Sequence, residues 1–167
     1  MDLAEVYRST FEKAARGERA HLRLTLKECQ ALAQQKPWRE SLFVLAHAVT
    51  GFSELEAAYL RVLPELSEDE ELVWWLNGAR KHLIGARLRD GERISPATLA
   101  ALESFFEGRS KAVLEWLLRT IDECGAQGIV FRPAFAKIKP RPWMLWQQES
   151  RTLLELITFL ERKWGVK

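Results

Sequence analysis

Apolar residues recur at helical spacing along nearly the whole chain, and this pattern restricts the fold to packed helices. The clearest stripe begins at Trp38 and continues in steps of three and four residues through Leu45 and Phe52 to Leu63. Such steps place apolar side chains on one face of a helix, whereas a half-buried strand requires strict alternation, which no segment shows. We therefore expect an all-α protein, a compact bundle of five or six helices that forms a single domain over residues 1–167.

Short signals set the expected helix boundaries. Pro64 is expected to end the long helix that begins at Trp38. Ser67 and Glu70 have the spacing of a capping box, which predicts a helix start there. Ser95 before a proline predicts a further start, and Gly125 predicts a C-terminal cap.

The segment from Cys124 to Gln148, the proline-rich segment, departs from this helical pattern. It contains three of the six prolines, four cations, four large aromatic residues and no Asp or Glu. Prolines interrupt helices, so we expect a long irregular segment over about 125–148 that lies across the bundle. Long loops inside compact domains are uncommon and are often functional.

Positive charge is concentrated in two parts of the sequence. Residues 78–93 carry a net charge of +3 and residues 124–148 carry +4, which leaves −5 for the rest of a chain whose total is +2. In the first part, Gly78-Ala79-Arg80 recurs seven residues later as Gly85-Ala86-Arg87, so the two arginines share a helix face and the two glycines indicate a close helix crossing. Such concentration is what a polyanion-binding face requires.

The first functional hypothesis is a non-enzymatic binding module or assembly subunit that contacts RNA or single-stranded DNA. Cations would follow the phosphates and aromatic side chains would stack on unpaired bases. It requires the two basic segments to form one exposed surface. The candidate binding residues are Arg80, Arg87, Arg132, Lys137, Lys139, Arg141, Trp143 and Trp146.

Other interpretations are open. Two of them concern the candidate binding residues and the aromatic residues near them, and one concerns the histidines. The tryptophans and arginines could anchor a protein partner or a homo-oligomer, because both types are enriched at interface hot spots. The aromatic residues of the proline-rich segment could instead fill gaps in the core, since large aromatics are highly buried on average. A third hypothesis is a ligand- or metal-binding bundle that uses His21, His47 and His82.

Enzymatic chemistry receives no support from local motifs. The chain has no phosphate-cradling glycine loop, dinucleotide fingerprint, serine elbow or His-Glu-x-x-His, and it lacks the two Glu-x-x-His motifs of a di-iron bundle. The sequence therefore predicts no catalytic residue, no cofactor and no metal ligand.

Composition predicts the setting in which the protein works. Cys29 and Cys124 are the only cysteines and both occupy apolar helical positions, as expected of reduced core thiols. No secretory signal and no membrane-spanning run is present, so we expect a cytoplasmic protein without a membrane partner. A single asparagine and many charged residues indicate a thermophilic source.

Overall fold

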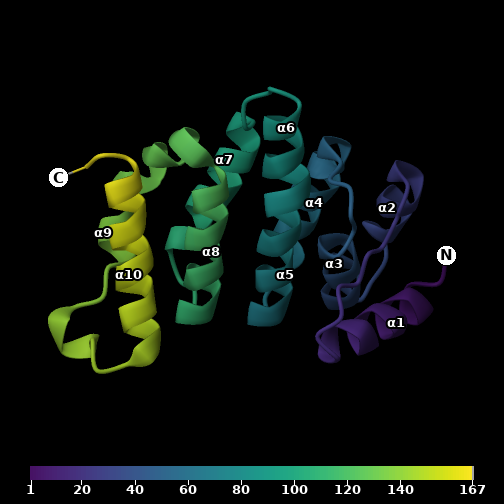
Figure 1. The fold of residues 1–167 in the computed structure, drawn as a ribbon, viewed down its shortest axis with the longest axis horizontal. Coiled ribbons are helices and arrows are strands. Elements are labelled where there is room, and N and C mark those ends of the chain that lie inside the picture. Colours follow the sequence, from purple (N-terminus) through teal and green to yellow (C-terminus); the bar gives the residue numbers. More distant parts are fainter. Residues whose placement is uncertain (167) are drawn as a thin grey trace. The chain divides into compact units, whose positions relative to one another are not determined.

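The computed structural model describes residues 1–166, and every regular element within them is a helix (Figure 1). The expected all-α fold is confirmed, although the helices are shorter and more numerous than five or six. The chain divides into two compact units, the N-terminal unit (Met1–Arg93) and the C-terminal unit (Ile94 onward). The single domain predicted from the sequence stays a prediction.

The N-terminal unit is built mainly on the packing of two helices, α3 against α5. Their buried faces include Leu42 and Leu45 from α3 and Trp75 and Leu76 from α5, and the indole Nε1 of Trp75 donates to the backbone carbonyl of Tyr59 at 2.9 Å. The α-helices of this unit are α1 (Leu3–Ala15), α2 (Leu26–Leu32), α3 (Trp38–Ala46), α4 (Glu56–Val62), α5 (Asp69–Ala79) and α6 (Ala86–Arg89). A π-helix (Arg80–Gly85) joins α5 to α6, and short 3₁₀ helices span Ser53–Leu55 and Leu63–Glu65.

The prediction of one long helix from Trp38 to Leu63 is wrong, because residues 47–52 between α3 and the following 3₁₀ helix are not helical. Helix α3 ends at Ala46, and the chain then runs beside the segment before α2, where the amide of Val49 donates to the carbonyl of Leu22. At Gly51 the backbone lies so close to the π-helix that a Cβ atom would meet the carbonyl oxygen of Lys81 at 2.4 Å. Periodicity cannot reveal such contacts between segments that are distant in the sequence.

In the C-terminal unit, α10 packs along α8 (Figure 1). Leu117 and Ile121 from α8 and Leu153 and Ile157 from α10 are almost completely buried. The α-helices of this unit are α7 (Pro96–Glu103), α8 (Lys111–Glu123), α9 (Phe135–Ile138) and α10 (Gln148–Lys163), and 3₁₀ helices span Ser104–Phe106, Gly125–Ala134 and Pro142–Met144. Among residues 1–166, no helix combines the length and apolar character that a membrane crossing requires.

The proline-rich segment is more regular than predicted. A ten-residue 3₁₀ helix (Gly125–Ala134) leads into α9, and only the part after Ile138 is largely irregular. Pro133 is compatible with this because it lies near the end of the 3₁₀ helix, next to the start of α9.

Helix starts and ends agree well with the short-range signals. Ser95 caps α7 by accepting a hydrogen bond from the amide of Thr98 at 3.1 Å, and Gly125 follows α8 with a φ of 58°. The capping box of α5 is displaced by one residue from its predicted position, because the carboxylate of Glu71 accepts from the amide of Glu68 at 3.2 Å.

Candidate functional site

A basic cavity of about 340 Å³ lies in the C-terminal unit, between the start of α8, the end of α9 and the irregular segment that follows α9. Its lining combines apolar and cationic residues: five of the lining residues are Lys or Arg, and none is Asp or Glu. The cationic members are Arg109, Lys111, Lys137, Lys139 and Arg141, and the apolar members include Phe106, Leu114, Ile138, Met144 and Leu153.

The start of α8 adds positive potential to this basic cavity. Ser110 is the N-cap and its hydroxyl accepts a hydrogen bond from the amide of Val113 at 3.3 Å. The first turn contains no acidic residue, and cations precede and follow the cap at Arg109 and Lys111. Cations at the positive end of a helix dipole are unfavourable, each by roughly 0.3–1 kcal/mol. A bound anion would offset this repulsion.

Two of the five cations have a hydrogen-bonding side-chain partner in the described part of the chain, and a third lies over an aromatic ring in the core. Lys137 pairs with Glu107 at 2.7 Å, and this hydrogen bond lowers the pKa of Glu107 and raises the pKa of Lys137. Both side chains are at least half exposed, so the pair is weak and exchangeable. Lys111 donates to the side-chain oxygen of Gln147, and Arg109 lies over the ring of Phe105 with its Nε buried and without a hydrogen-bond acceptor.

The remaining cations are available to a ligand. Lys139 is exposed and makes no ion pair or side-chain hydrogen bond within residues 1–166. Arg141 is exposed and stacks over the indole of Trp143 at 5.2 Å from the ring centroid. Arg132 lines a neighbouring cavity of about 360 Å³ that shares Lys139 with the basic cavity and also contains Glu161. The four predicted cations of this segment therefore lie along two adjoining cavities.

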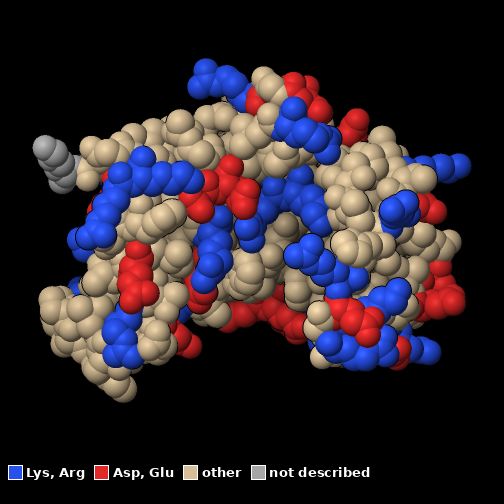
Figure 2. Space-filling model, viewed as in Figure 1, with Lys and Arg blue, Asp and Glu red and all other residues tan. Residues whose placement is uncertain are grey.

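The aromatic residues of the segment divide into two groups. Phe131 and Phe135 are buried against Phe106, with ring centroids at 6.0 Å in both cases, so these two fill the core. Trp143 and Trp146 are 66% and 76% exposed. The loop between α9 and α10, which carries both indoles, has a mostly uncharged outer surface at the lower left of Figure 2.

The two remaining predicted residues, Arg80 and Arg87, belong to the N-terminal unit. Arg87 is largely buried and pairs with Glu56 at 3.2 Å and with Glu92 at 3.5 Å. Arg80 is partly buried at the start of the π-helix. The prediction that the two basic segments form one surface stays a prediction.

Sequence reasoning missed Arg109 and Lys111. They precede and begin a helix that lies before the proline-rich segment, 30 residues ahead of Lys139 and Arg141, and nothing in their spacing links them to that segment. The only local signal is the reversed charge pattern at the start of α8, where a helix would ordinarily carry Asp or Glu.

The histidines do not converge on a metal centre in the described chain. Within residues 1–166, no group of three or more His, Cys, Asp or Glu side chains could hold a metal ion. Both ring nitrogens of His82 are used, since Nδ1 accepts from the amide of Phe52 at 3.0 Å and Nε2 lies 2.9 Å from the carbonyl oxygen of Leu45. His21 and His47 instead line a different cavity.

Comparison with known proteins adds no relative. No protein-family model, no curated protein and no solved structure matches the chain.

Proposed function

We propose that the C-terminal unit binds single-stranded nucleic acid, with phosphates on the cations of the basic cavity and bases on Trp143 and Trp146. The observation that carries the proposal is the cavity lining, which contains five cations and no Asp or Glu; the nearest carboxylate is that of Glu107, which pairs with Lys137. A polyanion supplies the negative charge that this lining lacks.

The exposed indoles favour unpaired bases over a duplex. Trp143 and Trp146 lie within four residues of each other on a surface loop, and Met144 between them lines the basic cavity. Stacking on an aromatic side chain contributes about 1–3 kcal/mol per base and requires bases that are not paired. The stacked Arg141 places a guanidinium beside the first of these platforms.

Buried thiols support a cytoplasmic site of action. Cys29 and Cys124 are both free and almost completely buried, and burial raises the pKa of Cys29 to about 11 and that of Cys124 to about 12. Thiols with raised pKa values are unreactive core residues, as in proteins of a reducing compartment.

The proposal is tested with fluorescently labelled oligo-U and oligo-dT and the full-length protein. We expect the double variant Lys139→Gln/Arg141→Gln and the variant Trp143→Ala each to weaken binding, the latter by roughly 5- to 150-fold if one base stacks. The matched control is Arg162→Gln, which removes an exposed cation of the same unit that lines neither cavity. The control removes one charge and the double variant removes two, so a loss of binding free energy half as large in the control would show that affinity reflects net charge and not this site.

A second candidate is a protein or homo-oligomer interface centred on the same two tryptophans. It is favoured by the exposure of Trp143 and Trp146, because tryptophan is the residue type most enriched at interface hot spots. Light scattering distinguishes the candidates: self-association that Trp143→Ala abolishes, without any affinity for oligonucleotides, would favour this second function.

A further inference from the structure

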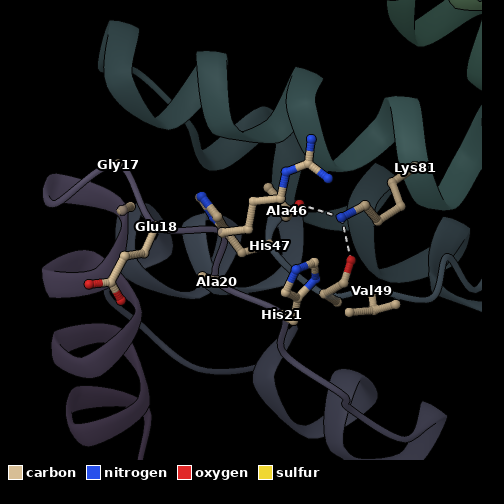
Figure 3. Close-up of a pocket in the computed structure, with 11 residues that line it drawn as sticks. Gly17, Glu18, Ala20, His21, Ala46, His47, Val49 and Lys81 are labelled. Atoms are coloured by element: carbon tan, nitrogen blue, oxygen red, sulfur yellow. Dashed lines mark hydrogen bonds between the residues drawn. The ribbon is translucent and has the colours of Figure 1, made fainter.

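A second cavity, of about 550 Å³, lies within the N-terminal unit and is unrelated to the proposed nucleic-acid site (Figure 3). It is open to solvent, and it is lined by the end of α1, residues 17–21, the end of α3, residues 46–49 and Lys81. Its volume is in the range of pockets that hold small organic molecules, about 300–1,000 Å³.

Lys81 supplies a cation whose charge no carboxylate balances. Its ammonium reaches toward the end of α3, where it donates to the carbonyl oxygens of Ala46, at 2.7 Å, and Ala48 (Figure 3). It forms no ion pair within residues 1–166, and burial lowers its pKa. An ammonium has three donors, and these two carbonyls use two of them.

The backbone around Lys81 is itself unusual. Lys81 lies in the π-helix Arg80–Gly85, whose widened turn follows α5 directly. π-helices are rare and occur frequently at functional sites, because the altered turn re-aims side chains. The location of this segment beside the cavity is therefore a second sign of function, independent of the charge.

Arg19 provides a second cation, and Glu18, the acidic residue of the lining, pairs with a residue outside the cavity. Arg19 is exposed and makes no side-chain hydrogen bond or ion pair within the described chain. Glu18, which also lines the cavity, pairs with Arg16 at 3.0 Å, and its carboxylate points away from Lys81 in Figure 3. The cavity is therefore electropositive.

The rest of the lining suits the body of an organic molecule. The His47 ring is held by a 2.8 Å hydrogen bond between Nδ1 and the carbonyl of Phe43, and by packing on the rings of Phe43, at 4.3 Å, and Trp74, at 5.4 Å. His21 and the small apolar residues Ala20, Ala46 and Val49 complete the surface. A fixed ring and small side chains leave space that apolar or planar groups fill without rearrangement.

We propose that this cavity binds a small organic anion. The acidic group, a phosphate or a carboxylate, lies between Lys81 and Arg19, and the body of the molecule packs against His21 and His47. Arginine offers a planar fork that matches either acidic group, and lysine contributes a point charge.

The test follows the ring-proton chemical shifts of His21 and His47 in the full-length protein at fixed ionic strength. AMP and benzoate represent the two acidic groups, and adenosine and benzyl alcohol are their uncharged counterparts. We expect saturable shifts with at least one anion, with a dissociation constant of about 1 mM or below, and none with its uncharged counterpart. Absence of saturable shifts with both anions would overturn the proposal.

Variants locate the binding site. Arg19→Gln is expected to weaken binding about tenfold, as for the loss of one charged hydrogen bond, and Arg23→Gln, which removes a nearby exposed cation outside the cavity, is expected to leave it unchanged. Lys81→Met should abolish the shifts while the protein stays folded by circular dichroism. Equal effects of Arg19→Gln and Arg23→Gln would contradict the proposal. Arg141→Gln, in the C-terminal unit, should change nothing, which separates this result from nucleic-acid binding.

Discussion

His82 is a neutral imidazole buried in the N-terminal unit, and both of its ring nitrogens are used. Its Nδ1 accepts from the amide of Phe52, so the proton is on Nε2, which donates to the carbonyl of Leu45. Desolvation by burial lowers its pKa from 6.5 to about 4. A folded-state pKa below the unfolded value means that the unfolded chain binds the proton first, so stability is complete above pH 6.5 and is lost as the pH falls toward 4.

The expected result is a decrease of about 2 kcal/mol in the free energy of unfolding between pH 7 and pH 5 from this residue alone. Urea unfolding at several pH values measures it. His82→Gln should have a shallower pH dependence over this interval. An unchanged slope in His82→Gln would show that other groups account for the pH dependence.

Between elements, the packing of α4 against α5 depends on the absence of a side chain at Gly78. A Cβ atom there would lie 2.0 Å from the hydroxyl oxygen of Tyr59 and 2.8 Å from its Cζ. The Tyr59 ring is fully buried against Trp75 and His82, so it has little freedom to move away. The close helix crossing predicted at Gly78 and Gly85 is not found within residues 1–166, because a side chain and not a second backbone fills the space at Gly78, and the only neighbour at Gly85 is the carbonyl oxygen of Arg80.

Gly78→Ala should therefore destabilise the protein by about 1–3 kcal/mol, despite the gain of roughly 1 kcal/mol in helix propensity. Tyr59→Phe alone should be close to neutral, because the removed hydroxyl is buried without a partner in the described chain. The combined variant should recover part of the loss, since the closest contact is gone. Thermal unfolding of the three variants checks this, and a more stable Gly78→Ala would contradict it.

Local signals predicted the elements better than they predicted the contacts between them. Ser95 and Gly125 marked real helix boundaries, because caps depend only on neighbouring residues. The break after Ala46 was missed, because it depends on Leu22 and Lys81, which lie far away in the sequence. The same difference holds for the candidate site. Lys139 and Arg141 were predicted because they lie in one charged segment, whereas Arg109 and Lys111 are brought to the cavity by tertiary packing and were missed.

For the whole molecule, a net charge of +2 is too small to attract a polyanion by itself. Affinity must come from local concentration of cations, and the basic cavity provides it in the C-terminal unit. The number of phosphates neutralised is then set by the cations of one site and not by total charge. For single strands, the logarithm of affinity falls with the logarithm of salt concentration with a slope of about −0.7 per phosphate contacted.

The salt dependence of binding to a single-stranded oligonucleotide tests the central claim most directly. If four of the cations contact phosphates, affinity should fall roughly 50-fold between 50 and 200 mM salt, from a slope of about −2.8. Lys139→Gln/Arg141→Gln should reduce the slope to about −1.4, and Arg162→Gln should leave it unchanged. An affinity that barely changes with salt, or a slope that the double variant leaves intact, would contradict the assignment of this cavity as a nucleic-acid site.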